Sequence, residues 1–294
     1  MKEKIYFLIS MIIFGAVGVF AKYITMPSAA IALCLSLIGT VFLLVLFKCT
    51  NKKVEWSKVK KNIAPLFIAS ITLSGNWIFL FEAYKETTIA NAALSYYFAP
   101  VLVILFSPVV LKERLSRKKL VCISVAFLGL FLILQNSNGS TTGNHLLGIT
   151  YGLIAAGFYA GLTLVNKFIQ DLDGLSNTLL QLSFAVVILF QFVLFTNELN
   201  YFSLTSDNVL LMLMMGILHG GIGFYLFFVG MNTLKGQSIA ILSYVDPLTS
   251  LLISVLFVGE KMSLQQLFGT VLLLGAIWIG DAVGEHEIMN DSFS

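Results

Sequence analysis

Long apolar runs separated by short polar breaks dominate the pattern of the chain. Ten such runs can be followed, most of them close to twenty residues long, which is about the length a helix needs to cross the hydrocarbon of a bilayer. Lipid satisfies no backbone hydrogen bond, so open strands are excluded and helices are predicted. The runs lie near 5–24, 29–47, 62–82, 88–110, 119–136, 146–168, 175–195, 208–230, 237–258 and 264–281.

Composition agrees with this pattern. The chain of 294 residues is 58% hydrophobic and 11% charged, whereas soluble domains carry about 25% charged residues. The polar loops 48–61 and 136–145 are too short for a soluble domain. Lys2 and Lys4 precede the first run as in a signal peptide, but that run exceeds the usual apolar core of about 7–15 residues. We therefore expect an all-α integral membrane protein of about ten spans, the first run included.

Basic residues orient the predicted bundle. With the N-terminus inside, the inner segments hold 15 Lys and Arg residues, and the outer side holds only Lys22, Lys85 and Lys261. Because cytoplasmic loops of membrane proteins are enriched in Lys and Arg, this asymmetry places both termini in the cytoplasm. A multi-pass protein of the cytoplasmic (inner) membrane is the expected localisation.

The two halves of the chain resemble each other. Residues 97–116 read YFAPVLVILFSPVVLKERLS and residues 244–263 read YVDPLTSLLISVLFVGEKMS, an offset of 147 that pairs Glu113 with Glu260. Residues 20–24 (FAKYI) also match residues 165–169 (VNKFI). We expect a first five-helix repeat at 1–140, a second at 141–284 and a cytoplasmic tail at 285–294.

The number of spans in each half determines how the halves relate. Five is odd, so the two halves must enter the membrane in opposite senses. Inverted repeats are typical of alternating-access transporters, whose substrate site lies at the midplane between the repeats. The pattern therefore favours transport over a duplication that has no such role.

Both motif copies resemble those of the EamA-type drug/metabolite transporter family. Each half has a proline in its fourth helix, then an apolar run, a Glu-basic-apolar-Ser segment and a glycine in the last helix. The copies are Pro100 with LKERLS (111–116) and Gly129, and Pro247 with VGEKMS (258–263) and Gly275. The two copies differ at one motif position, where the first has Lys112 and the second has Gly259. The resemblance spans nearly the whole chain and implies a carrier of amino acids, nucleobases, sugars or cationic compounds, but it does not specify the substrate.

Asp246 is the most informative candidate for chemistry. It lies near the middle of the run 237–258, where a charge is costly and carboxylates usually face a cavity. Ser243, Ser250 and Ser254 recur with it at helical spacing and form one polar stripe. We predict a proton site or a ligand for a cationic group that lines a central cavity. A hydrogen-bonded acid that merely fixes helix packing is the alternative.

Two mid-helix prolines, Pro100 and Pro247, are predicted kinks. Each removes an N–H and should free the carbonyl four residues earlier, that of Tyr96 or Ser243. Water or substrate can satisfy such a group at membrane depth, although a simple packing kink is equally compatible.

Further polar and aromatic residues near the midplane complete the predicted pocket. Tyrosine normally favours the membrane interface, so several at mid-depth suggest a site that stacks a ring or surrounds a cation. A packing role is the alternative for each, most of all for His219 in its glycine-rich run. The predicted substrate-binding or coupling residues are Asp246, Trp77, Asn76, Tyr97, Tyr244, Ser243, Ser74, Tyr159 and His219.

Other functional classes fit the sequence less well. An intramembrane lipid-modifying enzyme needs clustered acids or a paired base and nucleophile, and a receptor or channel-like module has no positive signal. Cys34, Cys49 and Cys122 form no metal-binding or disulfide pattern. We expect no metal, no cofactor, no catalytic residue, no bound nucleotide and no nucleic-acid partner.

The resulting hypothesis is a secondary transporter in contact with membrane lipid. It moves a small polar metabolite, an amino acid or similar compound, in the direction of export by alternating access. Coupling to protons and facilitated diffusion both stay open, as does the oligomeric state. A carrier of cationic or quaternary amines is the alternative.

Overall fold

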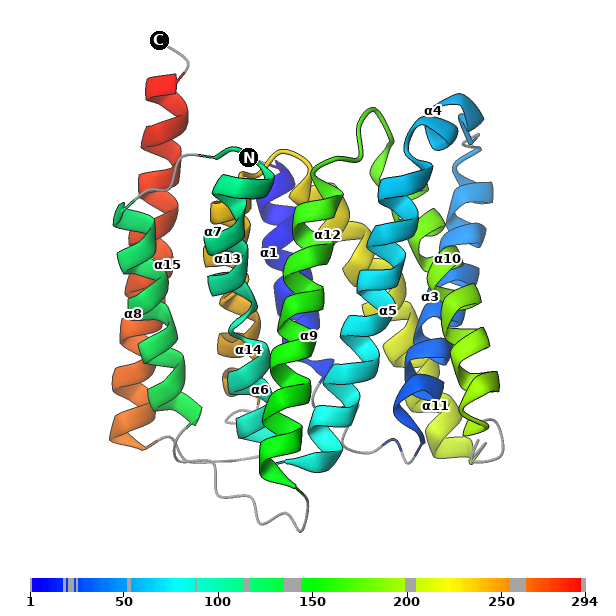
Figure 1. Cartoon of the computed structure of the whole chain (residues 1–294), viewed down its shortest axis with the longest axis horizontal. Helices are drawn as coiled ribbons and strands as arrows, with labels where there is room; N and C mark the ends of the chain where they lie inside the picture. Colours follow the sequence, from blue (N-terminus) through cyan, green and yellow to red (C-terminus); the bar gives the residue numbers. More distant parts are fainter. Residues whose placement is uncertain are drawn as a thin grey trace.

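The structure, a computed structural model, describes residues 2–17, 20, 24, 26–51, 54–87, 89–113, 117–134, 144–198, 205–253 and 263–291. All the regular elements in these ranges are helices. The long helices run between two ends of a bundle, and α1 begins at the same end at which α15 finishes (Figure 1). We refer to this end as the terminal end of the bundle and to the other as the far end.

The helices follow the predicted apolar runs closely. In the first half they are α1 (Lys2–Gly15), α3 (Ser28–Cys49), α4 (Trp56–Lys61), α5 (Ile63–Glu86), α6 (Ile89–Tyr96), α7 (Ala99–Val110) and α8 (Arg117–Leu134). In the second half they are α9 (His145–Asn166), α10 (Gly174–Phe195), α11 (Ser206–Met215), the π-helical segment η2 (Gly216–Gly223), α12 (Phe224–Met231), α13 (Gly236–Leu242), α14 (Val245–Ile253) and α15 (Leu264–Asp291).

Five helical segments in the described ranges are long and apolar enough to cross a membrane. They are Ser28–Cys49, Ile63–Glu86, His145–Asn166, Gly174–Phe195 and Asp207–Met231. Ala99–Val110 and Leu267–Gly280 are shorter apolar helices. The protein is thus an all-helical membrane protein, while the count of ten spans stays a prediction. The runs 88–110 and 237–258 each contain two helices instead of one.

Polar side chains determine where several helices begin. Asn144 accepts a hydrogen bond from the N–H of Leu147 at the start of α9. Asp173 accepts from the N–H groups of Leu175 and Ser176 at the start of α10. These caps satisfy backbone donors that have no partner within the helix. The apolar segments are therefore delimited by capping chemistry as well as by hydropathy.

A close glycine crossing joins the two halves. Gly39 of α3 lies so near Gly220 of η2 that a Cβ at position 39 would come within 2.7 Å of the Gly220 carbonyl carbon. A Cβ at position 220 would in turn lie 2.5 Å from the Leu35 carbonyl oxygen. Small residues allow such backbone contact between membrane helices. Any larger residue at either position would force α3 and η2 apart.

Large apolar side chains cover the outside of the bundle. Val109, Phe195, Leu264 and Trp278 are each largely exposed. A soluble monomer rarely exposes so much contiguous apolar surface. The same residues are at no disadvantage in lipid, so this surface fits a protein that spans a membrane.

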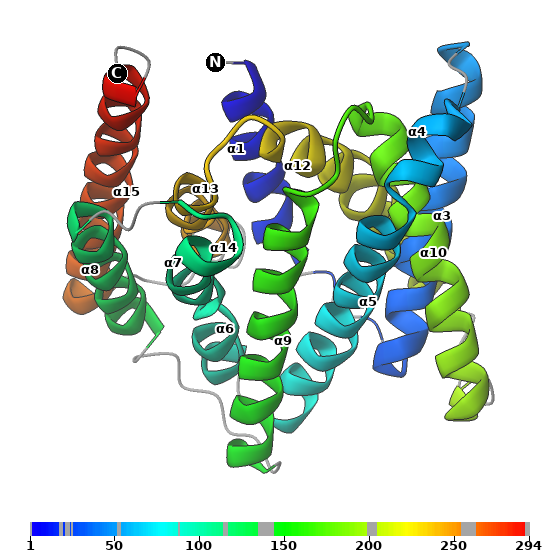
Figure 2. The same ribbon diagram turned by 45° about the horizontal axis from the view of Figure 1, so that its top comes forward.

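Helix packing pairs elements from opposite halves. α5 packs on α9, and α1 packs on η2 and α12. α3 packs on α10, and α8 packs on α15. Figures 1 and 2 show the α8–α15 pair side by side at one edge of the bundle. The core is therefore built between the halves, with few contacts confined to either one.

Candidate functional site

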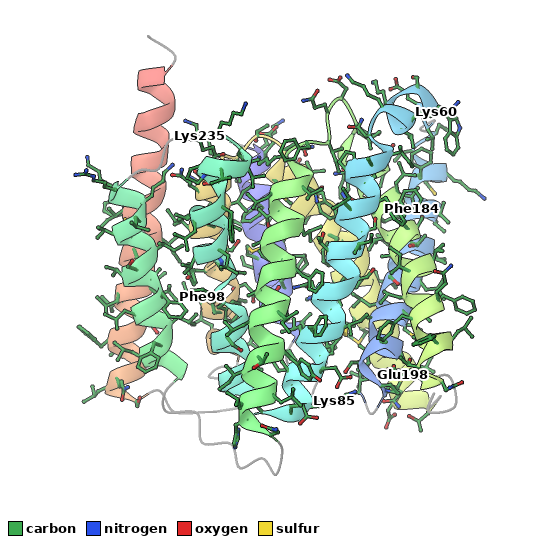
Figure 3. The ribbon with its side chains drawn as sticks, viewed as in Figure 1. Lys60, Lys85, Phe98, Phe184, Glu198 and Lys235 are labelled. Carbon is green, nitrogen blue, oxygen red and sulfur yellow. The ribbon has the colours of Figure 1, made fainter. Side chains whose placement is uncertain are left out.

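Two helices break at equivalent places. α6 ends at Tyr96 and α7 begins at Ala99, while α13 ends at Leu242 and α14 begins at Val245. Phe98, in the first break, lies about midway between the end that carries Lys235 and the end that carries Lys85 (Figure 3). Much of the backbone at the two breaks is paired within the turns, as when the N–H of Phe98 donates to Ser95 and that of Tyr244 donates to Ile241.

The prolines lie just after these breaks. Pro100 and Pro247 occupy the first turns of α7 and α14, where a missing N–H costs little. The backbone immediately before them, at Phe98 and Ser243, keeps α-helical φ and ψ angles. One part of the sequence prediction is corrected: the carbonyl of Ser243, predicted to be free, accepts the N–H of Asp246 at 3.2 Å.

Asp246, beside the second break, is hydrogen-bonded by a residue of the first break. The hydroxyl of Tyr97 donates to Oδ1 of Asp246 at 2.9 Å. The hydroxyl of Tyr244 donates to the backbone carbonyl of Tyr97 at 3.4 Å. A backbone acceptor exposed by the first break is thereby satisfied by the second. We call Tyr97, Ser243, Tyr244 and Asp246 the junction.

A second hydrogen bond connects the junction to α9. The hydroxyls of Tyr159 and Ser243 lie 3.3 Å apart. The ring of Tyr159 meets that of Tyr96 edge-on at 5.9 Å, and Tyr96 lies 5.5 Å from the ring of Tyr97. Predicted residues from three separate runs are thus brought together around one carboxylate.

Aromatic hydroxyl groups form the near surroundings of this carboxylate. The hydroxyl of Tyr97 bonds to it directly, and those of Tyr84, Tyr96 and Tyr159 lie within electrostatic range of it. Sequence analysis missed Tyr84, because it lies beyond the predicted end of the third run at residue 82. The structure extends α5 to Glu86, which places this tyrosine on the helix.

The other predicted residues lie farther along an aromatic network. Trp77 meets the ring of Phe224 edge-on at 5.2 Å, and His219 lies 4.8 Å from the ring of Phe14. Both are buried. Phe14 and Phe224 each pack on Phe227, which contacts Tyr159. Trp77 and His219 are thus connected to the junction through intervening rings.

Asn76 and Ser74 make structural hydrogen bonds. The amide of Asn76 donates to the carbonyl of Ala155 at 2.9 Å and joins α5 to α9. The hydroxyl of Ser74 donates to the carbonyl of Ser70 within its own helix. Asn76 also interacts with the Tyr96 hydroxyl, so its amide supports a ring beside the junction.

Sequence analysis also missed a buried amide network on α9 and α10. Asn166, Asn177 and Gln181 are each 5% exposed or less. The Gln181 amide nitrogen donates to the side-chain oxygens of Asn166 and Asn177, both at 2.7 Å. The spacing of Asn177 and Gln181 by four residues was the available signal. Without the fold, nothing indicated that Asn166 would face them.

Parts of the predicted site lie outside the described residues. These are the residue Ser254 and the side chain of Ser250. A depression of about 330 Å³ is lined by Leu120, Val121, Ser124, Val125 and Leu128 of α8, and no residue of the junction lines it. The central cavity around Asp246 therefore stays a prediction. Within the described ranges, no group of three His, Cys, Asp or Glu residues could hold a metal ion.

Comparison with known proteins identifies the family. The model of the EamA-like transporter family matches residues 1–135 and again residues 146–279. This chain belongs to that family. The resemblance seen in the two motif copies is therefore confirmed, and the protein is a multi-pass membrane transporter.

Bacterial relatives span almost the whole EamA-like chain. Uncharacterized transporter YxxF of Bacillus subtilis is 32% identical over 273 residues, with 92% of this chain and 86% of the relative covered. Uncharacterized transporter YojE of the same organism is 28% identical, with 91% and 89% covered. Uncharacterized inner membrane transporter YicL of Salmonella typhimurium is 25% identical, with 92% of each chain covered.

A solved crystal structure has the same fold. It superposes with a TM-score of 0.77 at 18% sequence identity and covers 95% of this chain and 97% of its own. At that identity the likeness bears on fold alone. The names of the relatives indicate a transporter but no substrate, so the chemistry must be argued from the junction.

Proposed function

We propose that this protein is a secondary transporter that moves a small polar metabolite across the cytoplasmic membrane by alternating access, with Asp246 as the residue that the substrate or a proton engages. The hydrogen bond from Tyr97 to Asp246 carries the proposal. It joins one half-helix from each half of the chain at mid-depth, the position where transporters of this kind bind their substrates.

Two inverted five-helix halves, 1–140 and 141–284, are part of this proposal. The packing of α5 on α9 has its counterpart in that of η2 and α12 on α1, as expected if the halves exchange roles. The packing of α7 on α9 has its counterpart in that of α14 on α1. The pairs α3–α10 and α8–α15 each join helices at equivalent places in the two halves. Superposition of the halves should require a two-fold axis in the membrane plane, and an axis along the membrane normal would contradict it.

Topology follows from the distribution of basic residues. Both termini are proposed to be cytoplasmic, as is the terminal end of the bundle, which carries Lys60 and Lys235 (Figure 3). A cysteine at position 140 should react with an impermeant thiol reagent added to intact cells. Reaction only after the membrane is permeabilised would reverse the proposed topology.

The substrate is proposed to carry an ammonium group. A carboxylate at mid-depth is costly unless it is protonated or paired, and an ammonium group would pair with it. Aromatic rings can add to the binding of a cation, and the rings of Tyr96, Tyr97 and Tyr159 lie together beside this carboxylate. An amino acid, in the direction of export, and a cationic or quaternary amine both meet this requirement.

Ligand binding separates the two possible roles of Asp246. A thermal-shift screen of the purified protein against amino acids and amines identifies a ligand, and counterflow in proteoliposomes tests whether it is carried. If Asp246 is purely a proton site, Asp246→Asn should still bind that ligand. If Asp246 holds the ammonium group, the variant should lose binding. Unchanged binding together with unchanged pH dependence of transport would return Asp246 to a packing role.

A further inference from the structure

Glu113 of the first motif copy makes contacts that the junction does not use. It lies just beyond α7, and its carboxylate reaches across to the start of α13. Oε1 accepts the N–H of Gly236 at 2.8 Å and Oε2 accepts the N–H of Gln237 at 3.4 Å. A carboxylate stabilises a helix start because it pairs with free N–H donors and with the helix dipole. Glu113 therefore ties the α7–α8 connection to the second broken helix.

Lys167 adds a third segment to the same cluster. It follows the last residue of α9, and its ammonium group donates to the carbonyls of Met231 and Leu234 at the end of α12. Cations are favoured at such carbonyls. The charge of Glu113 also acts on Lys167. The four residues of the α12–α13 connection are thus held from both sides by opposite charges.

A polar face of α9 leads from the junction to this cluster. Tyr159, Thr163 and Lys167 follow one another at intervals of four residues and so lie on one side of the helix. Tyr159 contacts the junction and Lys167 the cluster. The Thr163 hydroxyl between them is fully buried and has no hydrogen-bond partner. A buried hydroxyl usually has a partner, so water entering along this face would supply one.

Packing of the broken helices differs between the two ends of the bundle. α7 and α13, the half-helices nearer the terminal end, pack against each other. α6 and α14, the equivalent half-helices at the far end, share no comparable packing within the described residues. Among the described residues, the broken helices therefore pack more closely at the end where Glu113 and Lys167 lie.

The geometry points to Glu113 and Lys167 as a latch that closes the route between the junction and the terminal end of the bundle. This inference rests on the proposed function, from which it takes the two inverted halves. The equivalent residues of the other copies are Glu260, at the offset of 147, and Lys22, in the matching segment FAKYI. Both lie outside the described residues.

Thiol labelling tests the latch without any substrate. Cys34, Cys49 and Cys122 are replaced by alanine, and Thr163→Cys reports on the polar face of α9. An impermeant maleimide is applied from the side that carries the termini. Glu113→Gln or Lys167→Met should each speed labelling about tenfold, the equilibrium shift that corresponds to one charge-assisted hydrogen bond of about 1.5 kcal/mol.

Glu198→Gln is the matched control. Glu198 also accepts a backbone N–H at a helix start, that of Ala30 at 3.3 Å, but it lies at the far end with Lys85 (Figure 3). Its replacement should leave the labelling rate unchanged. Thermal midpoints show that each variant is folded, and Lys167→Met serves if Glu113→Gln does not fold.

A labelling rate that neither Glu113→Gln nor Lys167→Met changes would overturn the latch. Counterflow by the same variants is measured separately. If the protein carries no substrate but both variants speed labelling, the latch is kept and the proposed transport function is removed.

Discussion

The junction and the amide network are both polar clusters inside the bundle, but the network is buried whereas Tyr97 and Asp246 of the junction are only partly buried. In the network, Asn166, Asn177 and Gln181 bond to one another. Asn166 also donates to the carbonyl of Leu162 within its own helix. At the junction, a carboxylate receives one tyrosine hydroxyl and is otherwise surrounded by tyrosine side chains. A closed set of neutral amides stabilises packing, because each member satisfies another. A charged carboxylate at mid-depth destabilises the protein until a proton or a cation neutralises it.

This contrast assigns stability to one cluster and transport to the other. Replacements in the network should lower stability and leave transport per folded molecule intact. Replacements at the junction should lower transport per folded molecule and leave stability intact. The following experiments test that division.

Asp246→Asn should have the largest effect. The side chain keeps its shape but can neither release a proton nor pair with an ammonium group, so concentrative uptake into proteoliposomes should fall to the level of protein-free liposomes. Its thermal midpoint should not fall, because a costly buried acid is removed. Asp171→Asn, at an exposed acid that pairs with Lys61 at 3.5 Å, is the control and should transport normally. Uptake by Asp246→Asn at the wild-type rate would show that the junction carboxylate is not needed for transport.

Gln181→Leu should come next, with its effect on stability alone. The substitution leaves the side-chain oxygens of Asn166 and Asn177 without their 2.7 Å donors. Unfolding free energy should fall by about 1–3 kcal/mol, the cost of buried polar groups that lose their partner, as measured by denaturant unfolding in detergent. Ser183→Ala on the same helix, whose hydroxyl bonds only the carbonyl of Leu179 among the described contacts, should cost less. A transport defect in folded Gln181→Leu would place the network within the site.

The two junction tyrosines should give smaller and unequal effects. Tyr97→Phe removes the donor to the carboxylate, and uptake should fall about tenfold, as expected for a hydrogen bond to a charged group worth about 1.5 kcal/mol. Tyr244→Phe removes a longer bond to a neutral carbonyl, so uptake should fall by roughly twofold to fivefold. Initial uptake rates at saturating substrate measure both. Equal losses would mean that the hydroxyls act through packing and not through Asp246.

Much of the site was predictable one residue at a time. Asp246 was identifiable because an acid in an apolar run is rare and costly, and Tyr97 and Tyr244 because tyrosine normally favours the membrane interface and both lie near mid-depth. Their direct contact was not predictable, since their positions in the sequence say nothing about distance in space. The amide network was missed for the same reason, whereas Tyr84 was missed because it lies beyond the predicted end of its run.

The prolines show the limit of local inference most clearly. Pro100 and Pro247 correctly marked an irregularity in each fourth helix. Local rules alone, however, did not show how the backbone at each break is paired. The carbonyl of Ser243 accepts the N–H of Asp246 within its own break, whereas the carbonyl of Tyr97 accepts the hydroxyl of Tyr244 from the other break.

The sequence by itself determined the solvent, the class of element and the family. Apolar runs of membrane length allow only helices in lipid, and the two motif copies are visible without coordinates. Tertiary structure alone decided which polar groups are paired and which are not: the closed amide network, the tyrosine surroundings of Asp246, and the contacts of Glu113 and Lys167. The physical reason is that hydropathy is a property of each residue, whereas satisfaction of a buried polar group depends on the partners that the fold brings to it.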